Sequence, residues 1–448
     1  MVRICRRLTR PLSVLIIASI VIALYSQIPK VKIEVSTKLP SRDYFSAWKT
    51  IASRKHNLTL DDVKIQPVIQ KIAKNTHSTK TRPPLILIWT KYFGGEPLTN
   101  LEGFSNRISS CEYLCEYTGN RDEHFQSAEA VLFHSGSMDK NDTTILISLT
   151  RPQGQVWIYN NQESPANMET FTKLEILPHF RNLFNWTMTM RKDSDIYHPY
   201  GKIVKTEPMA TSIWNENLAK RRDIIRNKSK FAVWVTSHCI TNSRREKLVR
   251  ELARYIPIDI VGACGTWMRN YCIRKGTDYD TCFTKFAANY KFYLSFENSL
   301  CQDYVTEKFY NAVKHDIVPV VYSGGDMKSL APRGSYIDVR DFNGSRHLAE
   351  YLIELDKKEE EYEKYFEFKR NHEIIDKDEE SWCRLCEKVW LQRGQSVVQW
   401  YPDMAQWYEN EFENGERTGA KSCVDKSEIV FKTAMELAWE RFWDSIGL

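Results

Sequence analysis

The sequence lacks a strong imbalance of charge. Its 448 residues carry a net charge of only +6. No cluster of Lys and Arg is interleaved with aromatic residues, as a nucleic-acid groove requires to neutralise phosphates and stack bases. We therefore do not expect nucleic acid as a partner.

Internal repeats and low-complexity tracts are also missing. Hydrophobic residues make up 42% of the chain and aromatic residues 12%, which is sufficient for well-packed cores. A chain of this length can hold two medium-sized domains with extensions. We expect a globular protein of that organisation.

A second Cys-x-x-Cys pair at the spacing of a zinc site is absent. Ten of the eleven cysteines follow Cys5, an even number that suits disulfide bonds in a secretory compartment. We therefore expect Cys383 and Cys386, and likewise Cys111 and Cys115, to form structural disulfides rather than a metal or redox site. The sequence leaves the pairing open.

Residues 11–28 form an uncharged stretch that is the candidate membrane segment. Its 18 residues are enough to cross a bilayer. Four arginines precede it within residues 1–10, which predicts a cytoplasmic tail and a translocated remainder. No small-x-small cleavage site follows, so an uncleaved signal-anchor is favoured over a signal peptide. The prediction is a single-pass type II membrane protein.

Residues 29–84 are polar and rich in Lys, which predicts a stem between the membrane and the globular part. Five Asn-x-Ser/Thr sequons agree with a secretory location. The candidate glycosylation sites are Asn57, Asn141, Asn185, Asn227 and Asn343.

The globular part is predicted to be α/β, with two halves that face each other across a cleft. The halves span residues 85–201 and 202–390, and a C-terminal helical segment, 391–448, is expected to pack back on both. Alternating strand-like and helical runs in the second half imply parallel sheets. The predicted strands are 85–89, 130–134, 144–149, 156–160, 230–237, 257–262, 291–297, 317–322 and 335–339; the predicted helices are 243–255, 303–314, 345–370 and 425–447.

Ligands of parallel sheets bind beyond the carboxyl ends of strands, at helix N-termini. Ser243 and Glu246 have the spacing of a capping box, which would place Arg244 and Arg245 in the first turn of a helix. Arginines at this position favour contact with a phosphate. The alternative is a solvated surface pair.

A second junction follows the strand that ends near Asn298. Asp303 is expected to cap the next helix, which would place Glu307 and Lys308 in its first turn. Lys308 is expected to contact a phosphate and Glu307 a ribose diol. Two successive junctions of this kind indicate a diphosphate site, although a charged pair on an exposed helix is the alternative.

Asp193 and Asp195 form a D-x-D motif, which in one class of metal-dependent transferases holds a divalent ion on a diphosphate. A metal-dependent transferase is therefore one alternative. We do not expect an obligatory metal at these aspartates, because the arginine positions fit a metal-free mechanism better.

Four stretches resemble, in order, the motifs of the α1,3-fucosyltransferases of glycosyltransferase family 10, which use GDP-fucose. FYLSFENSLCQDYVTEKFYNAV, followed by VPVV, resembles the donor-site motif, and VTSHCITNSRREKLVREL resembles a second donor-side pattern. RPQGQVWIYNNQESPAN (151–167) and FNWTMTMRKDSDIYHPYG (184–201) resemble the acceptor-side and hinge-side motifs. The resemblance covers about residues 85–390, and His238, Cys239 and Cys301 resemble the nematode-like, invertebrate branch.

The resemblance implies two Rossmann-like domains in the GT-B arrangement and an inverting transfer of L-fucose to the 3-hydroxyl of GlcNAc. It makes Glu163 the general base, and it makes Arg245 and Lys308 the cations that stabilise the leaving diphosphate. Asn298, Tyr304 and Glu307 would hold the nucleotide.

It further implies a Golgi enzyme without an obligatory cofactor, while stimulation by Mn²⁺ or Mg²⁺ is left open. The acceptor is also open between an N-glycan core GlcNAc and an antennary unit. A non-catalytic glycan-binding Golgi protein is the other alternative.

Overall fold

The computed structural model describes residues 82–90, 111–138, 140–167, 181–265, 279–375, 380–397, 399–413 and 416–424. The predicted anchor, almost all of the stem, and the tail helix at 425–447 lie outside these residues. Within the described ranges, no helix is both long and apolar enough to cross a bilayer.

The first half contains a six-stranded sheet in which every neighbouring pair is parallel. Its central strands are continuous apolar runs, as expected for strands that are covered on both faces. The strand order is β2-β1-β3-β4-β5-β6. The strands are β1 (Leu85–Ile88), β2 (Glu116–Thr118), β3 (Ala130–His134), β4 (Val156–Asn161), β5 (Trp186–Thr189) and β6 (Ile196–Tyr197).

The strand predicted at 144–149 is wrong, because this run belongs to helix α6 (Lys140–Ser148). Asp142 and Leu146, four residues apart, are buried, whereas Thr144 and Ile145 between them are exposed. That spacing is helical, but a short apolar run does not distinguish a strand from a buried helix face. The short strands β2, β5 and β6 were not predicted.

The second half contains a five-stranded sheet, again parallel throughout, in the order β12-β11-β10-β8-β9. All five strands were predicted, with ends that differ by one or two residues. They are β8 (Lys230–Val235), β9 (Ile258–Val261), β10 (Tyr290–Phe296), β11 (Val318–Tyr322) and β12 (Ile337–Asp338).

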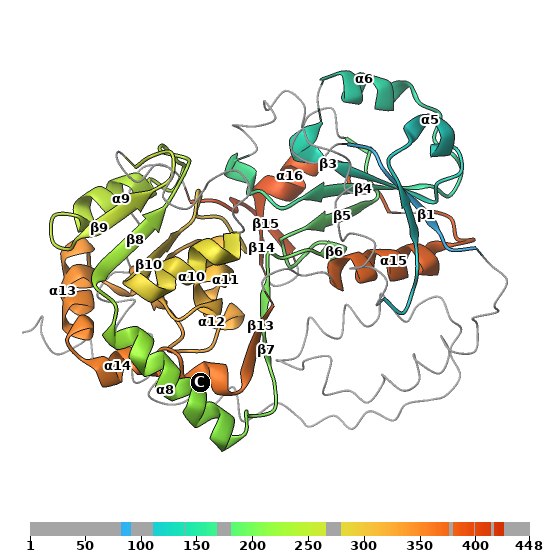
Figure 1. Ribbon diagram of the computed structural model, residues 1–448. Helices are drawn as coiled ribbons and strands as arrows, with labels where there is room; N and C mark the ends of the chain where they lie inside the picture. The colour runs from blue at the N-terminus through green and yellow to red at the C-terminus, as the bar shows by residue number, and fades with distance from the viewer. Residues whose placement is uncertain are drawn as a thin grey trace, which may run out of the picture. The chain divides into compact units, whose positions relative to one another are not determined.

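Helices cover both faces of the second sheet (Figure 1). Residues of α9 (Arg245–Leu252) and α13 (Ser345–Asp356) join one face in a common core. Residues of α10 (Tyr279–Asn289) and α11 (Glu307–Lys314) join the other face. This is the doubly wound arrangement that alternating strands and helices predict.

The strand order of the second sheet reverses between β8 and β10. From β8 the chain moves outward to β9, and it then returns to place β10 on the opposite side of β8. Crevices at such reversals, beyond the carboxyl ends of the strands, are where open α/β sheets bind ligands. The fold therefore marks the ends of β8 and β10 as the place for a site.

The chain passes between the halves along an antiparallel ribbon of β7 (Lys202–Lys205) and β13 (His372–Ile375). After β13, helix α15 (Glu380–Gln392) packs Trp382, Leu385 and Val389 against the first sheet. The predicted boundary at 390 had assigned this helix to the second half. The apolar face of α15 covers one face of the first sheet. The order of the elements along the sequence does not show which sheet a helix covers.

The remaining elements are mostly short. The helix predicted at 345–370 is divided into α13, α14 and the 3₁₀ helix η6, and the chain after α15 adds one helix and one hairpin. These elements are α5 (Arg121–His124), η3 (Ser135–Ser137), α8 (Thr211–Arg226), α12 (Met327–Leu330), η5 (Val339–Asp341), α14 (Glu359–Lys364), η6 (Glu367–Arg370), α16 (Met404–Glu409), β14 (Asn410–Glu413) and β15 (Glu416–Lys421).

Disulfide bonding confirms the structural interpretation of the cysteines. The two close pairs bond to each other rather than within themselves, and both bonds join α15 to the chain before β2. Two further bonds join the loop after β8 to the loop after β9, and the loop after β10 to the chain after β15. The four disulfides among the described residues are Cys111–Cys383, Cys115–Cys386, Cys239–Cys264 and Cys301–Cys423.

One of the glycosylation candidates, Asn185, lies inside the first half. Asn185 is completely buried, and its amide hydrogen-bonds Arg151, the Trp157 amide and the Gln399 carbonyl. A glycan at this position would remove those contacts from the core, and the use of Asn185 as a glycosylation site stays a prediction. Asn227 and Asn343 are exposed, as glycan attachment requires.

Candidate active site

A cavity of about 390 Å³ lies where the carboxyl ends of β8 and β10 face the first half. All six residues predicted for the site line it, although they come from three separate segments. The cavity is lined by Glu163, Tyr200, Val235, Thr236, Ser237, His238, Arg245, Asn298, Tyr304, Glu307 and Lys308.

Helix α11 brings Glu307 and Lys308 to this cavity, but its cap differs from the prediction. Thr306 is the N-cap, and its hydroxyl accepts from the Lys308 amide. Asp303 instead has a left-handed backbone, φ 61°, and its carboxylate accepts from the Lys192 amide of the first half. Both residues are cap formers, so the sequence alone could not choose between them.

The Lys308 ammonium lies between two carboxylates. Its Nζ is 3.3 Å from Glu297 and 3.2 Å from Glu307, and it donates to the Thr306 hydroxyl at 2.8 Å. Burial opposes the charge on Lys308, but Glu297 and Glu307 outweigh burial and raise its pKa. Lys308 is therefore held as a cation at the wall of the cavity.

Glu297 is the buried partner that sequence reasoning missed. Its side chain is 1% exposed, and its carboxylate accepts from the amide and hydroxyl of Thr306. Burial raises the pKa of Glu297, whereas Lys308 lowers it. Its position directly after β10 was the available signal, since a carboxylate at a strand end needs a partner.

Helix α9 starts at Arg245, but the predicted capping box is wrong. The Ser243 hydroxyl donates to the Glu297 carbonyl, and Glu246 accepts from Thr241 instead of capping the helix. Arg244 occupies the N-cap with a left-handed backbone and is exposed outside the cavity. Of the two arginines, only Arg245 lines the cavity.

The Arg245 guanidinium also holds the loops of the cavity together. It donates to the Phe296 carbonyl at 2.6 Å, to the Thr236 hydroxyl at 3.0 Å and to the His238 carbonyl at 3.3 Å. Burial lowers its pKa, and nearby Glu297 offsets part of that effect. An arginine stays charged in proteins, so this side chain places positive charge beneath both strand ends.

Two unsatisfied polar atoms lie at the same place. The Arg245 Nε and the Asn298 Oδ1 are buried without a hydrogen-bond partner among the described residues. Unpaired buried polar atoms are uncommon in folded proteins and are frequently found where a ligand completes the site.

Glu163 reaches the cavity from the loop after β4, in the first half. Its Oε2 accepts from the Tyr304 hydroxyl at 3.0 Å and from the Asn167 amide at 2.9 Å. Within the part of the chain that the structure describes, Oε1 has no hydrogen-bond donor. One oxygen is thus anchored while the other is available to a proton donor in the cavity.

Tyr304 is the second-half partner that orients this carboxylate. Burial, and then the charge of Glu163, raise its pKa well above the usual value. The hydroxyl is therefore protonated at neutral pH and donates to Glu163.

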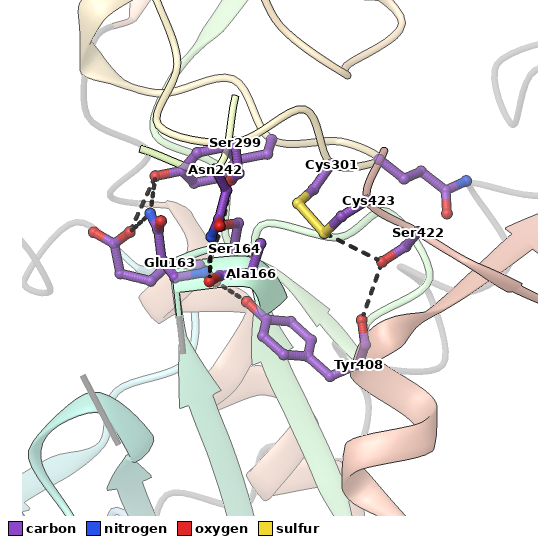
Figure 2. The surroundings of a disulfide bond; sticks show 12 residues. Glu163, Ser164, Ala166, Asn242, Ser299, Cys301, Tyr408, Ser422 and Cys423 are labelled. Carbon is purple, nitrogen blue, oxygen red and sulfur yellow. Dashed lines mark hydrogen bonds between the residues drawn. A yellow bond between two sulfur atoms is a disulfide. The ribbon is translucent and has the colours of Figure 1, made fainter. Parts of the chain in front are cut away.

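The loop that carries Glu163 contacts the second half at two further points (Figure 2). The Ser164 and Ser299 hydroxyls are 2.5 Å apart, and the Asn242 amide donates to the Ala166 carbonyl at 2.6 Å. These contacts position Glu163 relative to the strand ends of the other half.

The D-x-D aspartates are bound by protein groups outside this cavity. Asp193 pairs with Arg191 at 2.9 Å, and both side chains are at most 5% exposed. Asp195 accepts from the Thr187 amide at 2.9 Å and from the Tyr401 hydroxyl at 2.8 Å. Among the described residues, no group of three or more His, Cys, Asp or Glu has the arrangement of a metal site.

Replacing Asp195 by Asn is expected to lower the free energy of unfolding by about 1–3 kcal/mol, because the amide loses acceptor capacity toward Thr187 and Tyr401. Urea unfolding measures this loss. The donor KM of the remaining folded protein should stay within about twofold of the wild-type value. A large change in donor KM without a loss of stability would instead indicate a ligand-binding role for Asp195.

A larger cavity of about 1240 Å³ lies elsewhere in the first half, at the starts of its strands. Glu129, Gln155 and Val156 line it, and none of the six predicted site residues does. Parallel sheets bind ligands at the opposite, carboxyl ends of their strands, so the smaller cavity is the candidate active site.

Known sequences match the chain over both halves. Residues 81–201 match the family described as fucosyltransferase, N-terminal, and residues 225–407 match glycosyltransferase family 10 (fucosyltransferase), C-terminal. Alpha-(1,3)-fucosyltransferase C of Drosophila melanogaster is 30% identical over 359 residues, which cover 74% of this chain and 78% of the relative.

Two other relatives are similar. Alpha-(1,3)-fucosyltransferase fut-6 of Caenorhabditis elegans is 29% identical over 83% of this chain and 91% of its own length. Glycoprotein 3-alpha-L-fucosyltransferase A of Drosophila melanogaster is 34% identical over 66% of this chain, and the match spans only 54% of that relative.

A crystal structure of an α1,3-fucosyltransferase with GDP-fucose aligns at 15% identity and a TM-score of 0.46, over 72% of this chain and 95% of the other. The sequence matches extend across both halves and include the loop of Glu163 and helices α9 and α11. This chain therefore belongs to glycosyltransferase family 10, the family of the α1,3-fucosyltransferases.

Proposed function

We propose that this enzyme transfers L-fucose from GDP-β-L-fucose to the 3-hydroxyl of GlcNAc in glycoprotein glycans, with inversion at the anomeric carbon. The observation that carries the proposal is that Glu163, with one carboxylate oxygen hydrogen-bonded and the other available, lines the same cavity as two cations of the other half, Arg245 and Lys308. The family of the chain supports the donor, and the name of the glycoprotein 3-alpha-L-fucosyltransferase supports the acceptor class.

In the proposed reaction, Glu163 Oε1 takes the proton of the acceptor hydroxyl while that oxygen attacks the anomeric carbon of fucose. The bond from this carbon to the diphosphate oxygen breaks, and GDP leaves with the electron pair. The attack comes from the side opposite GDP, which changes the β linkage of the donor into an α linkage. The hydrogen bonds from Tyr304 and Asn167 keep the carboxylate oriented for this step.

The leaving group needs charge stabilisation more than it needs a proton, because a diphosphate is already a weak base. Arg245 and Lys308 supply positive charge at the ends of β10 and α9, where the diphosphate would lie. Asn298, Tyr304 and Glu307 would hold the nucleotide, and the unpaired Asn298 Oδ1 is available as an acceptor.

We further propose that the protein is a single-pass type II membrane enzyme of the Golgi, anchored by residues 11–28 and displayed on the stem of residues 29–84. The support is the sequence itself, namely the arginines before the uncharged stretch and the sequons after it. Disulfide bonds among the described residues agree with an oxidising compartment.

A transfer assay with the full chain in detergent tests the proposed activity. GDP-fucose, GDP-mannose and UDP-galactose would each be offered with an N-glycan bearing a core GlcNAc, and with LacNAc and LacdiNAc acceptors. NMR of the product should show an α-linked fucose at O3 of GlcNAc, formed from GDP-fucose only. Preferred use of another donor would contradict the proposal.

The same assay separates the alternatives. A metal-dependent transferase would lose its activity in EDTA. The ion pair of Asp193 with Arg191 and the hydrogen bond of Asp195 with Thr187 argue against that outcome. A glycan-binding protein without catalysis would bind the acceptors and transfer nothing, and the intact set of Glu163, Arg245 and Lys308 argues against it.

A further inference from the structure

The chain from Met404 to Val424 connects the two halves beside the candidate active site. Met404, Trp407 and Tyr408 of α16 are buried in a core of the first half. The Tyr408 ring packs edge-on against Tyr159 of β4, with centroids 5.8 Å apart. After the β14–β15 hairpin, Cys423 forms a disulfide with Cys301 of the second half.

The disulfide joins this segment to the loop that holds the nucleotide-side residues. Backbone hydrogen bonds flank it on either side, from Gln302 to the Ser422 carbonyl at 2.7 Å and from Val424 to the Leu300 carbonyl at 2.9 Å. Cys301 is completely buried, and its carbonyl accepts from the Tyr304 amide at 3.1 Å. The position of Tyr304 is therefore linked to that of Cys423.

Tyr408 connects the other end of the segment to the loop of the general base. Its hydroxyl donates to the main-chain carbonyl of Glu163 (Figure 2). Ser422 makes hydrogen bonds to the end of α16. Its hydroxyl donates to the Tyr408 carbonyl at 3.4 Å, and its backbone amide donates to the Glu409 carbonyl. Burial raises the pKa of Tyr408 well above its usual value, so it remains a donor.

These contacts form a closed series of bonds that begins and ends at Glu163. Glu163 is held at its Oε2 by Tyr304 and at its main-chain carbonyl by Tyr408. The two tyrosines come from different halves, and the Cys301–Cys423 bond is the covalent link between the segments that carry them. None of Tyr408, Cys301 or Cys423 lines the cavity.

We propose that the Cys301–Cys423 disulfide and Tyr408 together are a positioning device for the general base. They set the distance between the Glu163 carboxylate and the donor half, and so contribute to turnover without touching the substrate. This inference rests on the proposed role of Glu163 and adds the C-terminal segment 404–424 to the residues that determine the rate.

The test compares Cys301→Ser/Cys423→Ser with Cys111→Ser/Cys383→Ser in the full chain. The control removes a disulfide whose neighbour, Cys115–Cys386, still joins the same two elements. Without the Cys301–Cys423 bond, kcat should fall about 10- to 100-fold, the size expected for a displaced catalytic group. The Kd for GDP should stay within about twofold, and the control should keep its kcat.

Tyr408→Phe provides a second measurement that keeps every disulfide. It should lower kcat in the same way, and adding it to the Cys301→Ser/Cys423→Ser variant should cause little further loss, because both changes release the same carboxylate. If the double Ser variant does not fold, the kcat of Tyr408→Phe alone decides the question.

Unchanged kcat in both Tyr408→Phe and the double Ser variant would overturn the inference. So would equal losses in the Cys111→Ser/Cys383→Ser control, or a peptide map of the oxidised protein without a Cys301–Cys423 link. Glu163→Gln separates this inference from the proposed function. If Glu163→Gln is inactive while the positioning variants are normal, only the positioning role fails; if Glu163→Gln is fully active, the base assignment fails.

Discussion

Replacing Glu163 by Gln is expected to lower kcat for fucosyl transfer by about 10²- to 10⁴-fold, the usual contribution of a general base. Gln keeps the length of the side chain, and its carbonyl oxygen can still accept from Tyr304 and Asn167. The amide cannot take a proton from the acceptor hydroxyl, however. The variant should therefore fold, bind GDP with nearly unchanged Kd, and transfer almost no fucose.

Steady-state kinetics and calorimetric titration with GDP measure the two parts of this prediction. Glu207→Gln is a suitable control, because Glu207 is exposed between β7 and α8 and does not line the cavity. Wild-type turnover in Glu163→Gln would remove Glu163 from the mechanism. A large loss of GDP affinity would show that Glu163 serves donor binding instead.

Replacing Lys308 by Ala is expected to weaken GDP-fucose binding about 10- to 100-fold and also to lower kcat. A hydrogen bond to a charged group contributes about 1.5–3 kcal/mol, and every 1.4 kcal/mol is a factor of about ten. The charge of Lys308 should matter both in the ground state, against the diphosphate, and in the transition state, where negative charge grows on the leaving group. Donor KM and kcat, measured with saturating acceptor, test both effects.

Loss of Lys308 also leaves the buried carboxylate of Glu297 without its cation, which should reduce stability. The double variant Lys308→Ala/Glu297→Gln removes that unpaired charge while keeping the hydrogen bonds to Thr306. It should recover thermal stability but not donor binding. If donor binding returned together with stability, Lys308 would act only through the fold.

The comparison of sequence with structure shows where local patterns were sufficient. Strands β8, β10 and β11 of the second half are apolar runs of five to seven residues bounded by polar segments, so their existence was predictable. The first half was harder, because β2, β5 and β6 are short and the apolar run in α6 has the same length as a strand. Periodicity does not separate these cases.

The helix starts illustrate a second limit. Ser243 with Glu246, and Asp303, are good capping residues by type, but the structure uses them to bind the Glu297 carbonyl, the Thr241 hydroxyl and the Lys192 amide. The Glu297 and Lys192 partners, like the burial of Asn185 and of Asp193, depend on packing between segments distant in sequence. A capping pattern reports only what a residue can do locally.

By itself, the sequence determined the α/β class of both halves, the structural use of the cysteines, and the identity of six of the eleven residues that line the cavity. These follow from periodicity, from residue chemistry at strand ends, and from motifs that family members share. Only the tertiary structure decided which cysteines bond, that Glu297 pairs with Lys308, and that Tyr304 holds the Glu163 carboxylate while Tyr408 holds its main-chain carbonyl. The physical reason is that each of these contacts forms only when strand ends, loops and α16 pack together, and local sequence patterns do not report that packing.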